Sequence, residues 1–271
     1  MTTTSGELSG RTILVTGGAS GIGSAYADVS ARNGAALVLI DRDPEGLEAK
    51  AEELREAGAV VATYTADISD AAQVDAAFDE IEQQHPIDGA FLNAGVNGSV
   101  SQRLPEGEID VTSREDWHRV LSINLDGFFF TLQRTARIMK PRRRGTIVVT
   151  GSTAGFRAEP LIGYPYVASK HAVHALARQA ALELVHHGIR LNIIAPGSFQ
   201  TNIGGKTPPP PGKAEIWRKS IPLGRYGETD ELHDLALLLI SETRSSFMTG
   251  GVYVIDGGAS ALTQVTTAEL W

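Results

Sequence analysis

Tyr166 and Lys170 are the residues of this sequence with the clearest chemical use, because they lie four positions apart. Apolar side chains recur at close to helical spacing from residue 167 to residue 185, which predicts a helix over about residues 165–187. On a helix, positions i and i+4 share one face. A free phenol titrates at about pH 10, and a fixed cation stabilises its phenolate, so Lys170 could make Tyr166 a proton shuttle. A surface lysine beside a core tyrosine gives the same pattern by chance, so partners elsewhere must decide.

A glycine-rich loop follows an apolar, β-branched run at residues 12–15 and precedes a helical pattern. Strand, glycine loop and helix form the order that a phosphate cradle needs, because the backbone can approach a pyrophosphate and the helix N-terminus offers unpaired N–H groups. The loop lacks the Gly-Lys-Ser/Thr ending of a nucleoside-triphosphate loop, so a dinucleotide fits better. The candidate cofactor-binding residues here are Gly17, Ser20, Gly21, Ile22 and Gly23.

Asp41 ends a second predicted strand, residues 36–40, near the distance from Gly23 at which a carboxylate grips the adenosine ribose hydroxyls. A carboxylate there would repel a 2′-phosphate, which favours NAD as the cofactor over NADP. Arg42 follows directly and could receive that phosphate, or it could simply be solvated. We expect NAD on the strength of Asp41, with NADP as the less favoured alternative.

Two further strand ends carry candidate cofactor contacts. Asp67 and Ile68 follow a strand at residues 59–64, and Asp67 could contact the adenine amino group or equally cap the next helix. Residues 89–92 form a fourth strand that ends in Asn93, Ala94 and Gly95, whose small size suits close passage beside a cofactor. A plain strand-end turn is the alternative there. Strands that alternate with helices predict a parallel, doubly wound sheet.

Asn124 and Ser152 are polar residues at positions where chemistry is plausible. Asn124 lies among apolar neighbours in a helix that starts near Ser113, so it must either fasten backbone or join a polar relay. Ser152 follows a fifth strand, residues 146–149, but lacks the Gly-x-Ser-x-Gly elbow of a hydrolase nucleophile. Its hydroxyl could instead donate a hydrogen bond to a carbonyl oxygen.

Composition limits the other functions that the chain could have. A net charge of -8 argues against nucleic acid as a partner, and zero cysteines exclude disulfides and thiolate catalysis. No long apolar run is present, so we expect no membrane partner and a cytoplasmic location. The basic cluster Arg142–Arg144 lies where a helix should end, and a solvated cap is favoured over a docking patch. His171 and His174 are interpreted as helix surface, and no metal site is expected.

The order of these motifs resembles that of the short-chain dehydrogenase/reductase family, over nearly the whole chain from Gly10 to Gly258. Each pattern is weak alone, and the combination in this order is highly specific. The matching signatures are Thr-Gly-x-x-x-Gly-x-Gly at residues 16–23, Asn93-Ala94-Gly95, Asn124, Ser152, Tyr166-x-x-x-Lys170, and Pro196-Gly197 with Thr201. The family often has one residue fewer between Ser and Tyr, so the loop at residues 156–163 could differ in shape.

The resemblance implies a role for each catalytic residue. Tyr166 would be the general acid/base, Lys170 would depress its pKa and bind the nicotinamide ribose, and Ser152 would donate to the substrate oxygen. Asn124 would anchor a water that links Lys170 to solvent. The remaining implied cofactor contacts are Pro196, Gly197, Thr201 and the backbone near Phe199.

The resemblance also implies a Rossmann fold with a mostly parallel seven-stranded sheet, helices on both faces and a homotetrameric assembly. We expect a flexible segment at residues 1–10, one catalytic domain at residues 11–258 with a substrate lid at about residues 198–220, and a tail at residues 259–271.

The predicted function is NAD-dependent oxidation of a small secondary alcohol to a ketone, or the reverse. One rival is a 3-oxoacyl-carrier-protein reductase that uses NADP, with Arg142–Arg144 facing an acidic carrier. The other is a non-catalytic dinucleotide sensor.

Overall fold

The computed structural model describes residues 6–98, 100–201 and 218–262. Within these ranges a seven-stranded parallel sheet has the order β3-β2-β1-β4-β5-β6-β7. The strands are β1 (Thr12–Thr16), β2 (Ala36–Asp41), β3 (Val61–Thr65), β4 (Gly89–Leu92), β5 (Gly145–Thr150), β6 (Ile189–Pro196) and β7 (Val252–Ile255). The predicted doubly wound sheet is therefore confirmed, and its strand order reverses between β1 and β4, the kind of point at which open α/β sheets bind their ligands.

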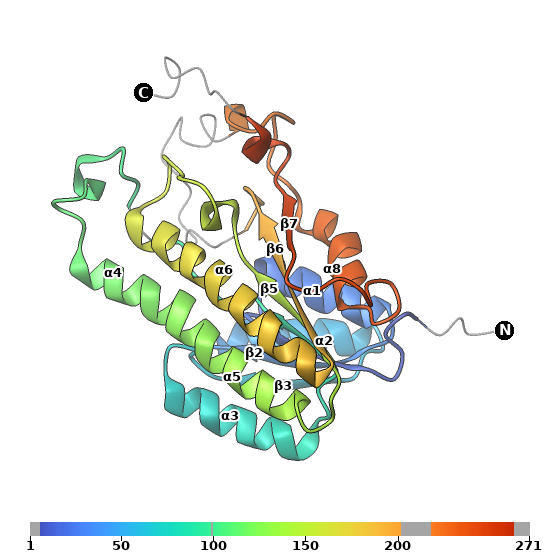
Figure 1. Cartoon of the computed structure of the whole chain (residues 1–271). Helices are drawn as coiled ribbons and strands as arrows, with labels where there is room; N and C mark the ends of the chain where they lie inside the picture. The colour runs from blue at the N-terminus through green and yellow to red at the C-terminus, as the bar shows by residue number, and fades with distance from the viewer. Residues whose placement is uncertain (1–5, 99, 202–217, 263–271) are drawn as a thin grey trace.

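Helices cover both faces of this sheet (Figure 1). They are α1 (Gly21–Arg32), α2 (Pro44–Glu56), α3 (Ala71–Gln84), α4 (Arg114–Leu121), α5 (Gly127–Met139), α6 (Tyr164–Leu184) and α8 (His233–Ile240). The core under α3, α5 and α6 contains Leu14, Val149 and Ile193, whereas the core under α1, α2 and α8 contains Val15, Val148 and Ile194. Neighbouring strand residues thus enter opposite cores, as the two-residue period of a strand requires.

The N-terminal segment contacts the rest of the domain. Leu8 is buried, its N–H donates to the carbonyl of Asn33 at 2.9 Å, and the Glu7 carboxylate accepts from Ser241 and Thr243. Glu7 and Leu8 are therefore joined to the rest of the domain, and the flexibility of residues 1–10 stays a prediction. Residues 1–5 lie outside the described chain, as do residues 202–217, most of the predicted lid, and residues 263–271 of the predicted tail.

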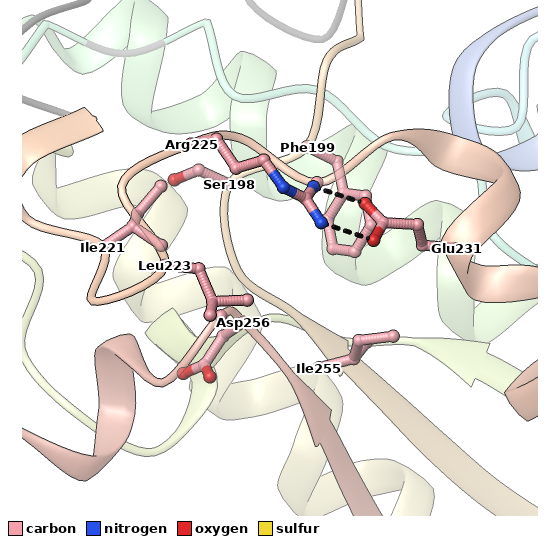
Figure 2. A pocket seen from close by; sticks show the side chains of 10 residues that line it. Ser198, Phe199, Ile221, Leu223, Arg225, Glu231, Ile255 and Asp256 are labelled. Atoms are coloured by element: carbon pink, nitrogen blue, oxygen red, sulfur yellow. Dashed lines mark hydrogen bonds and ion pairs between the residues drawn. The ribbon is translucent and has the colours of Figure 1, made fainter.

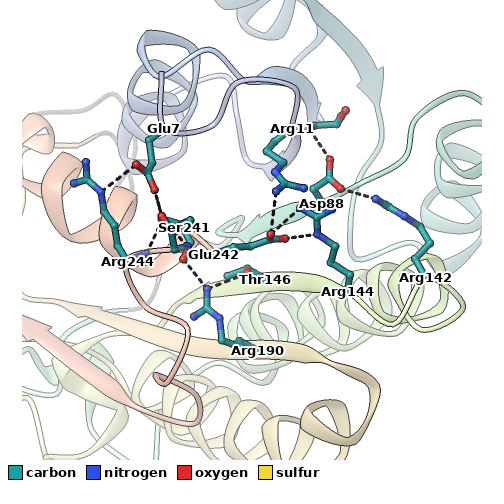
Figure 3. A network of polar contacts seen from close by, with 12 residues as sticks. Glu7, Arg11, Asp88, Arg142, Arg144, Thr146, Arg190, Ser241, Glu242 and Arg244 are labelled. Carbon is teal, nitrogen blue, oxygen red and sulfur yellow. Dashed lines mark hydrogen bonds and ion pairs between the residues drawn. The ribbon is translucent and has the colours of Figure 1, made fainter. Parts of the chain in front are cut away.

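The edge of the sheet where the strands begin carries a network of arginines and carboxylates (Figure 3). Arg144 pairs with Glu242 at 2.7 Å, and Arg142 pairs with the nearly buried Asp88. The guanidinium of Arg190, on β6, donates to the carbonyls of Met248 and Ser241. Arg142 and Arg144 belong to the basic cluster that was predicted to form a solvated helix cap. They instead link the starts of strands to neighbouring loops, at the edge of the sheet opposite the carboxyl ends of the strands.

No helix in residues 6–98, 100–201 or 218–262 is long and apolar enough to span a membrane.

Candidate active site

The glycine loop closes tightly over the end of β1. Gly17 and Gly21 have positive φ angles of 70° and 58°, a backbone region that favours glycine. A Cβ on Gly23 would overlap the carbonyl of Gly17, so the first turn of α1 can approach the loop only because residue 23 lacks a side chain. A backbone cradle of this form, at a helix N-terminus, fits a pyrophosphate.

Asn93 and Ala94 fasten the end of β4 to the same loop. The Thr16 hydroxyl accepts from the N–H groups of Asn93 at 2.9 Å and Ala94 at 3.2 Å, and the Asn93 amide donates to the Thr16 carbonyl. The Asn93 oxygen accepts from the Thr150 hydroxyl at 3.0 Å. These bonds show the strand-end turn that the sequence allowed, and the passage of a cofactor beside it stays a prediction.

Asp41 lies beside the glycine loop at the end of β2. One of its carboxylate oxygens accepts from the N–H of Ala19 and the other from the N–H of Asp43, each at 3.1 Å. Arg42 is exposed. These bonds fix a negative charge beside the glycine loop.

Asp67 and Ile68 have separate roles. The Asp67 carboxylate accepts from the N–H and the hydroxyl of Ser69, whereas Asp70 caps α3. Ile68 is buried in the core, where it contacts Gly127, so only its backbone can face a cofactor.

The segment after β6 borders a cavity of about 90 Å³ (Figure 2). The Phe199 side chain lines this cavity, as do Arg225 and Glu231, whose charged groups pair at 2.7 Å. Only the Phe199 backbone therefore remains for the predicted carboxamide contact. Thr201 is close to the glycine loop, since a Cβ on Gly21 would lie 3.5 Å from the Thr201 side chain. Gly197 packs against Asp256, where a Cβ would clash.

Tyr166 and Lys170 lie in the first turns of α6, the predicted helix, and Lys170 contacts the end of β5. The Lys170 ammonium donates to the Thr150 carbonyl at 2.9 Å and lies 5.8 Å from the centre of the Tyr166 ring. Tyr166 hydrogen-bonds the Ser152 hydroxyl. The Ser152 oxygen also accepts from the N–H of Ala154 at 3.1 Å, which leaves its proton to point at Tyr166. The side chains of Tyr166, Lys170 and Ser152 are all more than nine-tenths buried.

The pKa values of this pair differ from the prediction. Burial raises the pKa of Tyr166, the Ser152 hydrogen bond opposes that rise, and the charge of Glu159 adds to it. Burial lowers the pKa of Lys170 to about 8. The expected depression of the phenol pKa by Lys170 is thus not found in the protein alone: desolvation is the main cause of the shift, and the ammonium is bonded to a carbonyl rather than to the phenol.

Asn124 lies in a π-helical turn, Ser122–Asp126, that separates α4 from α5. Its side chain accepts from the N–H of Val96 and donates to the carbonyl of Val96, both at 2.8 Å, and it also donates to the Ser169 hydroxyl. The Asn124 amide therefore fastens the Val96 backbone, and its bond to Ser169 leaves a part in a polar relay as a prediction. Gly95 leaves space beside both groups, since a Cβ there would lie 3.0 Å from the Asn124 oxygen and 3.8 Å from the Lys170 nitrogen.

His174 is a site residue that the sequence analysis missed. It was interpreted as helix surface, which is wrong: the side chain is 5% exposed, and its Nε2 lies 3.2 Å from the N–H of Ser152. His171 is exposed as expected. A signal was present, because residue 174 continues the four-residue spacing of Tyr166 and Lys170.

Comparisons with known proteins agree with this geometry. A family model described as enoyl-(acyl carrier protein) reductase matches residues 17–260. Galactitol 2-dehydrogenase (L-tagatose-forming) of Cereibacter sphaeroides is 36% identical over 93% of this chain and 96% of its own, and levodione reductase of Leifsonia aquatica is 37% identical over 93% and 94%. The crystal structure of a gluconate 5-dehydrogenase from Burkholderia cenocepacia with NADP and tartrate has a TM-score of 0.86 at 34% identity, covering 94% of this chain and 97% of that one.

The chain belongs to the short-chain dehydrogenase/reductase family. The resemblance and the fold predicted from the sequence are thereby confirmed. As a member of this family the chain is an oxidoreductase that uses NAD or NADP. The glycine cradle and the carboxylate of Asp41 fit such a dinucleotide.

The lowered pKa of Lys170 makes stability depend on pH. Between about pH 8 and pH 10 the unfolded chain binds a proton that the folded chain has released, so stability rises with pH in this window. We expect the unfolding free energy of the wild type, relative to that of Lys170→Met, to increase by up to about 1.4 kcal/mol per pH unit there. Urea denaturation at several pH values measures this difference, in which the tyrosine contributions cancel. A flat difference would contradict a buried, depressed lysine.

Proposed function

We propose that the protein interconverts a small secondary alcohol and a ketone with NAD, and that Tyr166 is the general acid/base. The observation that carries this proposal is the set of three buried groups, phenol, hydroxyl and ammonium, at the carboxyl end of β5. They lie next to the point where the strand order reverses, which is where ligands of open α/β sheets bind.

Each side chain has a distinct task in this mechanism. In the oxidation direction the Tyr166 phenolate removes the proton from the alcohol, and in reduction the phenol returns a proton to the carbonyl oxygen. Ser152 donates to the substrate oxygen, whose charge changes during the reaction. The nicotinamide, when bound, accepts or supplies the hydride at C4.

Proton supply to Tyr166 depends on the buried lysine. Because the pKa of Lys170 is about 8, its ammonium can release a proton near neutral pH more easily than an exposed lysine would. In the proposed enzyme Lys170 binds the nicotinamide ribose and replaces the proton that Tyr166 gives away. Asn124 then keeps the adjoining backbone of Val96 in place rather than acting directly on the substrate.

The cofactor preference that we propose is NAD. Asp41 presents a fixed carboxylate that can accept from the adenosine ribose hydroxyls and would repel a 2′-phosphate. The related gluconate 5-dehydrogenase contains NADP, and Arg42 is exposed beside Asp41, so NADP is the alternative.

The carrier-protein rival receives some support from the description of the matching family model. Its docking patch does not fit the geometry, however, because Arg142 and Arg144 are paired with Asp88 and Glu242 where the strands begin. The catalytic groups lie where the strands end. A carrier held by these arginines would have to deliver its acyl chain across the whole sheet.

A homotetramer remains our proposal for the assembly. Several large apolar side chains on helices are exposed in the single chain, and subunit contacts would bury them. These side chains are Trp117, Phe129, Leu182 and Val185. We expect multi-angle light scattering to give four times the mass of one chain, whereas a stable monomer would overturn the proposal.

Tyr166→Phe tests the central role in the mechanism. The ring remains and the proton is lost, so we expect kcat to fall at least about a hundredfold while the Kd for NAD stays within about twofold. Absorbance at 340 nm measures turnover with a panel that includes galactitol, gluconate and levodione. Turnover of the variant within a few-fold of the parent would refute the role of Tyr166. Tight NAD binding without turnover of any substrate by the parent would favour the non-catalytic sensor.

Asp41→Asn tests the cofactor preference, because the amide oxygen can still accept from Ala19 while the charge is removed. We expect the ratio of kcat/KM with NAD to kcat/KM with NADP to fall by about tenfold to a hundredfold, since charge-assisted bonds to the ribose are lost and phosphate is no longer repelled. Arg42→Ala is the control and should leave the NAD value unchanged. A parent enzyme that prefers NADP, and loses this preference in Arg42→Ala, would contradict the assignment.

A further inference from the structure

The imidazole of His174 lies between α6 and the segment that carries Ser152. Its Nε2 is 3.2 Å from the Ser152 backbone nitrogen, and the side chain is 5% exposed. A backbone N–H can only donate, so Nε2 must be the acceptor and must carry no proton. The contact therefore requires the neutral form of the ring, with its proton on Nδ1.

The space for this ring is provided by the residues on either side of Ser152. A Cβ on Gly151 would overlap Nε2 of His174, and a Cβ on Gly155 would lie 2.5 Å from Cε1 of the same ring. Both positions are glycine, so the main chain wraps closely around the imidazole. The fit restricts where the Ser152 backbone can lie.

Three side chains at four-residue spacing on α6 contact the same short segment. Lys170 donates to the Thr150 carbonyl, Tyr166 hydrogen-bonds the Ser152 hydroxyl, and His174 accepts from the Ser152 N–H. The backbone and the side chain of Ser152 are thus both bonded to the helix that carries the acid/base.

The surroundings keep the ring neutral. Burial is the main cause that lowers the pKa of His174 to about 4, and the positive charges of Lys170, His171 and Arg178 lower it further. The ring of Phe156 lies 6.2 Å away, on the side of the segment after β5. At neutral pH the acceptor is therefore present.

We propose that His174 is a positioning residue, which as a neutral acceptor fixes the main chain of Ser152 so that the serine hydroxyl faces Tyr166 and the substrate oxygen. The proposal rests on the proposed function, because it assigns His174 a task in the same site. His174 itself touches neither the phenol nor the ammonium in the contacts described.

The test compares three variants of the full chain. His174→Leu fills similar space without an acceptor and leaves the Ser152 N–H buried and unpaired, so we expect kcat to fall by about tenfold to a hundredfold with the KM for NAD within about twofold of the parent. His174→Gln restores an oxygen acceptor and should recover most of that loss. His171→Gln, on the exposed side of the helix, is the matched control and should leave kcat unchanged. The best substrate of the alcohol panel serves as the probe.

A spectroscopic measurement on the wild type does not depend on the folding of any variant. With selectively ¹⁵N-labelled histidine, we expect one ring to keep an unprotonated Nε2 and a protonated Nδ1 from about pH 6 to about pH 8, where a free histidine would titrate. His174→Gln should remove that signal. A protonated Nε2 in this range would overturn the proposal.

The kinetic outcomes also separate the proposals. Parent-like kcat in His174→Leu, or equal losses in folded His174→Leu and His174→Gln, would overturn the positioning role while leaving the acid/base role of Tyr166 intact. A parent without turnover would remove the proposed function and this role together, whereas the tautomer signal would still show whether the ring holds Ser152.

Discussion

The contact between α6 and the end of β5 is the constraint on which the rest of the site depends. One helix face supplies the Lys170 bond to Thr150, the Tyr166 bond to Ser152 and the His174 bond to the Ser152 N–H. The sheet fixes the strand and the core fixes the helix, so the relative position of phenol, hydroxyl and ammonium follows from packing rather than from flexible loops. Preorganisation of this kind lowers the reorganisation that catalysis requires.

Burial restricts the positions of these side chains, and it also shifts their pKa values. Desolvation raises the pKa of Tyr166 and lowers that of Lys170 and His174, so each group is moved toward its uncharged form. For His174 the uncharged form is the one that can accept from Ser152. For Tyr166 the shift opposes the phenolate, so the proposed acid/base role would need a further favourable charge near the phenol, which an oxidised nicotinamide held in the site would supply.

Much of the fold was predictable because strands and glycines leave local signals. The first five strands were expected within a few residues of their bounds, since buried strands form short apolar runs and the loop after β1 needs glycine at Gly17, Gly21 and Gly23. The π-helical turn around Asn124 was not expected, because it depends on side-chain bonds to Val96, distant in sequence. The burial of Leu8 was also missed, since its partner is the carbonyl of Asn33.

The candidate site was predictable for a different reason, and there is a physical cause for the one residue that the prediction missed. Tyr166, Lys170 and Ser152 were singled out because residues of these types are rarely found in this order outside active sites, and the structure places the three side chains together. His174 was overlooked because a histidine on a helix is usually solvated. In the structure, Gly151 and Gly155 leave the space that its ring fills. The absence of a side chain at Gly151 and Gly155 is thus as informative as the presence of one at residue 174. The position of Ser152 accordingly depends on how closely the backbone can approach the helix, and a sequence pattern of polar residues alone does not contain that distance.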